Sequence, residues 1–372
     1  MTPTHQQITQ ALSTVDDPDL KQDLVTLNMI QDIRIDGSQV SFTVVLTTPA
    51  CPLKEMIKQA CLQAIAEHVS PDLSVDIQMT SNVTSTRRSQ APILPQVKNI
   101  IAIASGKGGV GKSTVAANLA VSLASMGAKV GLIDADIFGP SIPTMFNCER
   151  EQPGVKVVDG KNVIEPLEQY GVKLISMGFL MAADDAVVWR GPMASKALQQ
   201  FLSDVDWGEL DYLLIDLPPG TSDIHLTLVQ SVPVTGAVIV TTPQKVALAD
   251  ARKGLAMFRQ GQINVPILGI AENMAYFTPA ELPDHRYYIF GQHGGHQLAE
   301  EARVPFLGEI PLVQAVRESG DQGYPAVLRQ DDDTLVTTRH AFETLAQEFA
   351  RQVAIRNANQ SKTKLVEMTR GV

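Results

Sequence analysis

The stretch SGKGGVGKST, which begins at Ser105, limits the possible folds of this chain more than any other feature. Its residues 106–113 fit the pattern G-x-x-x-x-G-K-[S/T]. The apolar run IIAIA precedes the pattern, and the helical stretch TVAANLAVSLASM follows it. A strand, a glycine-rich loop and a helix in this order form a phosphate-binding loop. A glycine-rich turn without a ligand is the alternative, and the flanking strand and helix argue against it.

The residues of the loop predict how a nucleotide is held. Glycines let backbone N–H groups turn toward phosphate, and the helix N-terminus adds partial positive charge. Lys112 is expected at the β- and γ-phosphates, and Ser113 is expected on Mg²⁺. The ATP-binding residues predicted from the loop are Gly106, Lys107, Gly108, Gly109, Val110, Gly111, Lys112, Ser113 and Thr114.

Short apolar runs that alternate with helical stretches predict an α/β fold from residue 98 onward. The runs are NIIAIAS, KVGLIDAD, YLLIDLPP, GAVIVTTP and ILGIAENM. Strands that are apolar throughout are buried on both faces, as in a mostly parallel sheet with helices on each side. Ligands of such sheets bind at the carboxyl ends of the strands. We expect this P-loop NTPase domain to span residues 98–358 and a polar tail to follow at 359–372.

Residues 1–80 are predicted to form a separate, small α+β domain. QITQALSTV and CPLKEMIKQACLQAIAEHV have helical spacing, and QDIRIDGSQVSFTVVLTT predicts two strands around an Asp-Gly turn. DLSVDIQMT predicts a last strand. Residues 81–97 contain Ser, Thr and Pro without periodicity, which is typical of a linker.

Charge and cysteine content narrow the class of protein. The net charge of -10 argues against a general nucleic-acid binder. No apolar run is long enough to span a bilayer, and the polar, acidic N-terminus is unlike a signal peptide. Cys51, Cys61 and Cys148 form no paired framework. We therefore expect a reduced, cytoplasmic protein without a membrane or nucleic-acid partner.

Two apolar strands end in aspartates. GLIDADIFGPS places Asp134 and Asp136 at the end of one, and LLIDLPPGTSD places Asp216 at the end of another. A buried carboxylate is costly unless it faces positive charge. Each aspartate alone could cap a helix, but together with the loop they predict a nucleotide and Mg²⁺ site.

GKGGVGKST resembles the deviant Walker A sequence of the MinD/ParA/Mrp class of P-loop ATPases. The resemblance implies that Lys107 reaches across a homodimer to the partner's nucleotide and stabilises phosphate charge as an arginine finger does. A solvated loop lysine is the alternative. The resemblance also implies that Asp136 orients the attacking water. Lys107, Lys112 and Asp136 are therefore the catalytic residues that we expect for slow, dimer-dependent ATP hydrolysis.

The same class implies three further roles. The residue matching Asp134 lies close to the Mg²⁺ shell, and the residue matching Asp216 binds Mg²⁺ through water. In ILGIAENMAYF, Asn273 matches the residue that reads the adenine edge through its amide, and a buried turn asparagine is the alternative. The resemblance places Pro311, in GEIPL, near the base.

Other stretches resemble one branch of the class. RGPM (Arg190–Met193), DLPPGTSDIHLTL and ENMAYF are similar to the Mrp/ApbC family of iron–sulfur cluster carrier ATPases. DDPDL (Asp16–Leu20) and TTPACPL (Thr47–Leu53) resemble a small domain shared with PaaD- and SufT-like iron–sulfur assembly factors. The resemblance implies ATP and Mg²⁺ as cofactors, a labile iron–sulfur cluster, and apo iron–sulfur proteins or assembly scaffold proteins as partners.

The chain departs from that family where a cluster would be bound. Many members carry a C-x-x-C pair shortly after the Asn-Met dipeptide, but here NMAYFTPAELPDHRYYIFGQHGGHQLAEE contains no cysteine. Clusters need thiolate ligands. Cys51, just before Pro52 and a helix, is the candidate thiol, because a helix N-terminus favours the thiolate; a small buried residue is the alternative. His293 and His296 have H-x-x-H spacing but are more typical of polar loop residues.

Two other functions stay open at this point. A MinD/ParA-like positioning ATPase would need a membrane-binding or DNA-binding tail, and the C-terminal stretch carries basic residues. These are Arg351, Arg356, Lys362, Lys364 and Arg370. However, the apolar positions Leu345, Phe349 and Val353 end before most of them, which favours a helix docked on the core. An ATP-dependent regulator without a metal cluster is the other alternative.

Overall fold

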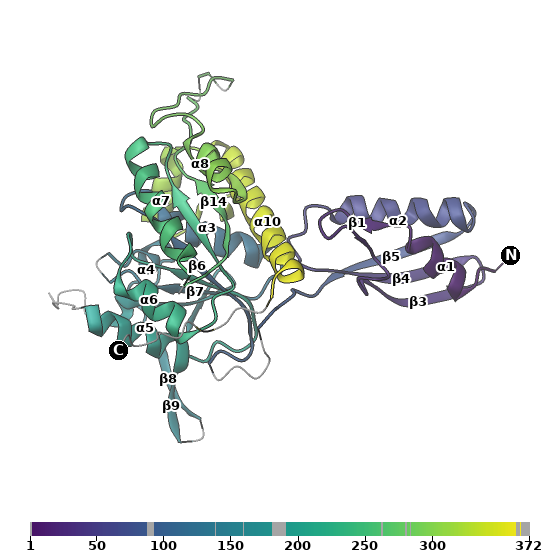
Figure 1. Ribbon diagram of the computed structural model, residues 1–372, viewed down its shortest axis with the longest axis horizontal. Coiled ribbons are helices and arrows are strands. Elements are labelled where there is room, and N and C mark those ends of the chain that lie inside the picture. The colour runs from purple at the N-terminus through teal and green to yellow at the C-terminus, as the bar shows by residue number, and fades with distance from the viewer. Residues whose placement is uncertain are drawn as a thin grey trace. The chain divides into compact units, whose positions relative to one another are not determined.

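The computed structural model describes residues 2–87, 93–137, 139–158, 160–180, 191–261, 263–279, 281–282, 284–361 and 365. The chain forms two compact units (Figure 1). Residues 1–84 and 353–360 form the smaller unit, and residues 85–352 and 361–372 form the larger one. Arg190, Lys362, Lys364, Arg370 and most of the predicted polar tail lie outside the described residues.

The smaller unit has the predicted α+β fold. Its elements are α1 (His5–Leu12), β1 (Asp16–Asp17), β2 (Gln22–Asp23), β3 (Ile30–Asp36), β4 (Gln39–Leu46), α2 (Lys54–His68) and β5 (Ser74–Ser81). Strand β4 is central, antiparallel to β3 and parallel to β5. The turn between β3 and β4 is the predicted Asp36–Gly37 turn, and Gly37 has φ +59° there. A capping box between Thr4 and Gln7 begins α1.

Alternation along β4 explains the core of the smaller unit. Val40, Phe42, Val44 and Leu46 are buried, and the residues between them are only half-buried. Because side chains alternate across a strand, one face of the sheet carries the apolar residues. Buried residues of α1 and α2, Cys61 among them, pack in the same core.

The larger unit is built on a sheet of eight strands within the described residues, in the order β10-β11-β7-β12-β6-β13-β14-β15. All neighbouring pairs are parallel except β10 and β11. The strands are β6 (Val97–Ala104), β7 (Val130–Asp134), β10 (Leu167–Gln169), β11 (Val172–Ser176), β12 (Leu210–Asp216), β13 (Gly236–Thr241), β14 (Ile267–Glu272) and β15 (Phe306–Glu309). β8 (Gly154–Val158) and β9 (Lys161–Glu165) form a separate hairpin, which the sequence did not predict.

Helices surround this sheet. They are α3 (Lys112–Ser125), α4 (Ile142–Met145), α5 (Gly191–Ser203), α6 (Asp223–Ser231), α7 (Lys245–Arg259), α8 (Gly294–Ala302), α9 (Gln314–Asp321) and α10 (Val336–Asn359), with 3-10 helices η1 (Met177–Leu180), η2 (Ala326–Leu328) and η3 (Asp333–Leu335). Along β6, Ile100, Ala102 and Ala104 face one apolar core, and Ile101 and Ile103 between them are buried as well. Both faces of the sheet are therefore covered, as the continuous apolar runs predict.

The carboxyl ends of the central strands meet at one edge. Strands β7, β12 and β6 are neighbours, and Asp216 at the end of β12 lies opposite Asp134 on one side and Ile103 on the other. The phosphate-binding loop follows β6 at the same edge. No described helix is both long and apolar enough to cross a membrane.

Candidate functional site

The phosphate-binding loop has the backbone geometry that its glycines predict. It leaves β6 after Ala104 and enters α3 at Lys112. Gly109 and Gly111 have φ of +80° and +77°, which side-chain-bearing residues rarely adopt. Gly106 has a different role, because a Cβ there would lie 2.1 Å from the carbonyl carbon of Asp250 in α7. The backbones of the loop and of α7 therefore touch at Gly106.

Lys112, Ser113 and Asp216 form a buried cluster at the start of α3. The Lys112 Nζ lies 2.5 Å from Asp216 Oδ1, and the Ser113 Oγ donates to Asp216 Oδ2 at 2.6 Å. The side chains of Lys112 and Asp216 are 6% and 0% exposed. Burial raises the pKa of Asp216, and the Lys112 ammonium opposes that rise. The structure thus brings together three of the sequence-predicted site residues.

Asp134 lies beside this cluster but faces other partners. Its Oδ1 accepts from the backbone N–H of Asp136, and its Oδ2 accepts from the N–H of Ile142 and from Ser176 Oγ. The side chain is fully buried. Burial, and then the neighbouring Asp216, raise the pKa of Asp134 to about 7.

Two cavities adjoin at the loop. The first, about 230 Å³, is lined by residues 105 and 107–114 together with Asp136, Ser141, Met145 and Pro219. The second, about 470 Å³, is lined among others by Asn273 and Pro311. Thr114, Ser141 and Met145 line both. Lys107 is exposed at the first cavity, and no described residue forms an ion pair with it.

Asn273 joins the end of β14 to the phosphate-binding loop. Its side chain is buried, and its Nδ2 donates to the carbonyl of Val110 at 2.9 Å. The following residue, Met274, has φ +54° and lines the second cavity. The sequence pattern could not show this contact, because Val110 and Asn273 are far apart in the chain.

His225 is a further residue near the loop that the sequence did not single out. It lies in the first turn of α6, where its Nδ1 accepts from the backbone N–H of Ser222 at 3.2 Å. Its Nε2 is buried and has no hydrogen-bond partner among the described residues. Burial lowers the pKa of His225 to about 4, so the ring is neutral near pH 7.

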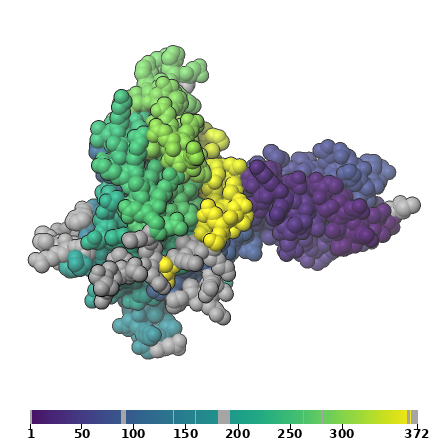
Figure 2. Space-filling model, viewed as in Figure 1, coloured from purple at the N-terminus to yellow at the C-terminus, as the bar shows by residue number. Residues whose placement is uncertain are grey.

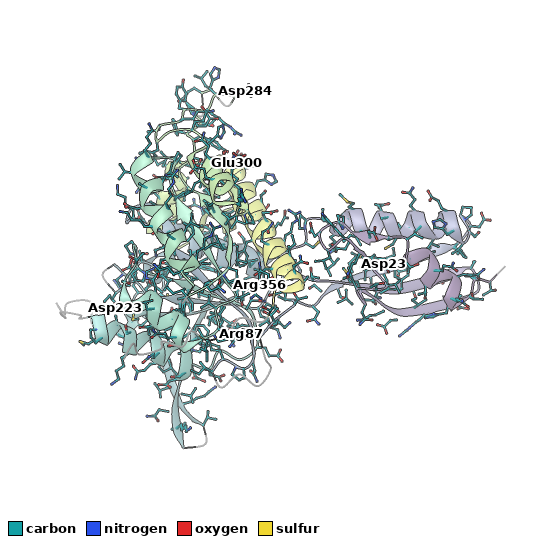
Figure 3. All side chains as sticks on the ribbon, in the orientation of Figure 1. Asp23, Arg87, Asp223, Asp284, Glu300 and Arg356 are labelled. Atoms are coloured by element: carbon teal, nitrogen blue, oxygen red, sulfur yellow. The ribbon has the colours of Figure 1, made fainter. Side chains whose placement is uncertain are left out.

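Part of the stretch without cysteines, after Asn273, forms an arm, which we define as residues 276–279, 281–282 and 284–291. Phe277 and Tyr287 pair through two backbone hydrogen bonds, and Arg286 lies over the ring of Tyr276. Phe277, Tyr287 and Ile289 are large apolar or aromatic residues on its surface. Figure 3 labels Asp284 on this arm and Glu300 on α8, and the arm projects from its unit in Figure 2.

The other candidate ligands do not gather at one place. Cys51 is half-buried in the smaller unit, two residues before Leu53, the N-cap of α2. Cys61 and Cys148 are buried. His293 is the N-cap of α8, and its Nδ1 lies 3.1 Å from Glu309 Oε1. His296 is inside that helix rather than in the predicted loop. Within the described ranges, three or more His, Cys, Asp or Glu side chains nowhere come together in an arrangement that could hold a metal ion without other ligands.

Comparison with known proteins matches both units. The family model of NUBPL iron-transfer P-loop NTPases matches residues 96–350, and that of iron–sulfur cluster assembly proteins matches residues 5–79. An iron–sulfur cluster carrier protein of Synechocystis is 48% identical over 353 residues, which are 95% of this chain and 98% of that protein. The chain belongs to the iron–sulfur cluster carrier family of P-loop NTPases.

Two further similarities extend this result. The iron–sulfur cluster carrier protein of Escherichia coli is 41% identical over 343 residues, 92% of this chain and 90% of that protein. A nucleotide-binding protein of Archaeoglobus fulgidus, solved in complex with ADP, is 40% identical with a TM-score of 0.55. It covers 66% of this chain and 93% of its own. The predicted family and fold are confirmed.

Proposed function

We propose that the chain is a slow, dimer-dependent ATPase that assembles iron–sulfur clusters or transfers them to apo-proteins. The buried cluster of Lys112, Ser113 and Asp216 carries this proposal, because it joins a cation, a hydroxyl and a carboxylate at a phosphate-binding loop. Membership of the carrier family supports the iron–sulfur part.

We propose that ATP occupies the two adjoining cavities. We place its phosphates in the first cavity, where the loop N–H groups and the N-terminus of α3 attract anions. We place its nucleoside in the second cavity, beside Asn273 and Pro311. Lys112 would then leave Asp216 for the β- and γ-phosphates, which carry more negative charge than one carboxylate.

The side-chain oxygen atoms of Ser113 and Asp216 are suitable ligands for Mg²⁺. Ser113 Oγ and Asp216 Oδ2 are 2.6 Å apart, and such hard oxygen ligands suit a small divalent cation. Ser113 would bind the ion directly and Asp216 through water, whereas Asp134, on the adjacent strand, would lie close to this site without binding the ion. When bound, the ion would neutralise part of the negative charge of the phosphates. Asp136, which lines the first cavity, would orient the attacking water.

Lys107 supports a dimeric mechanism. It lies on the exposed rim of the phosphate cavity, and no ion pair to it is present in the described part of the chain. A cation in this place is available to a nucleotide on a second copy of the chain. Hydrolysis would therefore need two copies, each supplying Lys107 to the other, as an arginine finger is supplied in trans.

The three cysteines differ in how well they could bind an iron–sulfur cluster as cargo. The arm carries no cysteine, and Cys61 and Cys148 are buried with pKa values raised to about 12 by burial. A thiol that stays protonated is a poor cluster ligand. Cys51 is thus the thiol that we propose for a cluster, alone or with ligands from a partner protein.

Three lysine variants test the ATPase. Lys112→Ala is expected to abolish hydrolysis and weaken ATP binding, whereas Lys107→Ala should spare binding and abolish hydrolysis. Lys161→Ala, an exposed lysine in β9, is the matched control and should behave as wild type. Phosphate release and nucleotide binding are measured for each, and light scattering gives the mass with an ATP analogue and Mg²⁺. Normal turnover by Lys107→Ala, or a monomer with the analogue, would refute the dimeric mechanism.

Anaerobic reconstitution with iron and sulfide tests the cargo. Wild type and Cys148→Ala should gain visible absorption and bound iron, and Cys51→Ala should gain neither. Equal iron in Cys51→Ala would exclude the proposed thiol. No iron in wild type would favour the alternative that the missing C-x-x-C pair suggests, an ATP-dependent regulator without a cluster.

A further inference from the structure

We propose that Asp134 is a positioning residue whose carboxylate, held by Ser176, fixes the backbone that carries Asp136. This inference rests on the proposed function, in which Asp136 orients the attacking water. It assigns a role to Ser176, which is far from the phosphate-binding loop in sequence.

The hydrogen bonds of Asp134 reach both ends of a segment that we define by its described residues, 136–137 and 139–142. Asp134 Oδ1 accepts from the Asp136 N–H, and Oδ2 accepts from the Ile142 N–H, both at 3.2 Å. Ile142 is the first residue of α4. One side chain therefore fixes the beginning of this segment and also its end, where the next helix starts.

The partners of Asp134 and Asp216 lie in different directions. Asp216 contacts Lys112 and Ser113, at the start of α3. Asp134 contacts Asp136 and Ile142 of the segment, and Ser176 of β11, instead. Its carboxylate is fully buried and accepts three hydrogen bonds. The two adjacent carboxylates are thus divided between the phosphate-binding loop and the segment of Asp136.

Ser176 has one arrangement that satisfies its neighbours. It ends β11 opposite Asp134 in the sheet, and its Oγ accepts from the Gly178 N–H at 2.9 Å. Its own proton is donated to Asp134 Oδ2, also at 2.9 Å. A hydroxyl that bridges a backbone N–H and a buried carboxylate keeps that carboxylate in one orientation.

Close packing supports the segment from the same side. A Cβ on Gly178, in η1, would lie 3.2 Å from Pro143 Cγ and 3.3 Å from Pro140 Cβ. These prolines flank Ile142, so η1 and the segment are in tight contact. Gly178 in η1 therefore supports the segment by close packing, and Asp134 holds it from β7. Ser176, at the end of β11, acts on the segment through Asp134.

Substitutions at both ends of the Ser176–Asp134 bond test the proposal. Asp134→Asn keeps the shape but replaces one acceptor oxygen with a donor, and Ser176→Ala removes the hydroxyl. Ser176→Thr keeps the hydroxyl. Each variant is assayed for kcat, for ADP affinity, for the Mg²⁺ concentration that gives half-maximal activity, and for hydrogen exchange in peptides containing Asp136 and Ile142.

We expect Asp134→Asn and Ser176→Ala to lower kcat by about 10- to 100-fold, the usual effect of misplaced catalytic groups. ADP affinity and the Mg²⁺ requirement should not change, and Ser176→Thr should recover kcat. The Asp136 and Ile142 amides should exchange about tenfold faster, as expected when a hydrogen bond is lost. A merely structural role would lower ADP affinity together with kcat.

The opposite results would overturn the proposal. Wild-type kcat and exchange in Ser176→Ala would do so, even if Asp134→Asn failed to fold. A raised Mg²⁺ requirement in Asp134→Asn would assign this carboxylate to the metal instead. If wild type itself hydrolysed no ATP, the proposed function would fail, and the exchange rates alone would still decide whether Asp134 and Ser176 fix the segment.

Discussion

Gly106→Ala should break the contact between the phosphate-binding loop and α7. The new Cβ would lie 2.1 Å from the carbonyl carbon, 2.2 Å from the oxygen of Asp250 and 2.4 Å from the nitrogen of Ala251. Carbon atoms in contact are about 3.5 Å apart. The loop or the helix would therefore have to move by more than an ångström, and backbone atoms cannot turn aside as a side chain can.

The cost follows from this displacement. Overpacking a tight site costs about 1–3 kcal/mol, and a clash with backbone belongs at the upper end. In a domain of this size, each kcal/mol of lost stability lowers the melting temperature by about 2–4 °C. A loss of about 3 kcal/mol in the free energy of unfolding therefore lowers the melting temperature by about 6–12 °C. Scanning calorimetry measures it, and the transition that ADP shifts upward identifies the larger unit.

Two other glycines of the loop provide matched controls. Among the described residues, a Cβ on Gly108 would meet only Pro219 Cγ, at 3.8 Å, so Gly108→Ala should leave the melting temperature unchanged or slightly raised. A Cβ on Gly109 would meet no described atom within 4 Å, but Gly109 has φ +80°, so Gly109→Ala should cost about 1–2 kcal/mol through backbone strain alone. If Gly106→Ala melts no lower than Gly108→Ala, the reasoning from the α7 contact is wrong.

Three further predictions concern single side chains. The pKa of His225 is lowered from 6.5 to about 4 by burial, so the folded state binds fewer protons than the unfolded state between these values. The neutral ring therefore contributes up to about 3 kcal/mol to the free energy of unfolding above pH 6.5, and this contribution is lost as the pH falls toward 4. The melting temperature of His225→Gln should depend less on pH over this range than that of the exposed-site control His285→Gln. An equal pH dependence in both variants would contradict the assignment. Iodoacetamide should modify the half-buried Cys51 in the native protein, and the buried Cys61 and Cys148 only after unfolding. Peptide mass spectrometry measures the order of modification. Early modification of Cys61 would show that its assignment as buried is wrong. Asn273→Ala should weaken ADP binding by about five- to tenfold, because it removes one buried hydrogen bond to the loop. Asn162→Ala, on the exposed β8–β9 hairpin, is the control and should not weaken binding. Calorimetric titration with ADP compares the two variants.

The sequence predicted those parts of the fold that depend on local pattern. Continuous apolar runs identified β6, β7, β12, β13 and β14, because a strand buried on both faces leaves this signal. The Asp36–Gly37 turn identified the first hairpin. Strand β10 and the β8–β9 hairpin were missed, because short strands whose residues are only exposed or half-buried leave no such pattern.

The candidate site was predictable only as far as its residues are adjacent in sequence or end recognisable strands. Lys112, Ser113 and Asp216 meet as a phosphate-binding loop and an acidic strand end predict. The Ser176–Asp134 and Asn273–Val110 contacts depend on the order of strands in the sheet, which no local pattern specifies. His225 was missed because a histidine beside apolar residues gives no sign of how deeply its ring is buried.

The two margins of the eight-stranded sheet have a consequence for the behaviour of the chain in concentrated solution. Its interior strands are so apolar that an open margin would invite pairing with another molecule. The outermost strands, β10 and β15, have only 3 and 4 residues, and each carries a glutamate. Such short, charged borders offer little backbone for intermolecular ladders, which protects the folded protein from strand-to-strand aggregation.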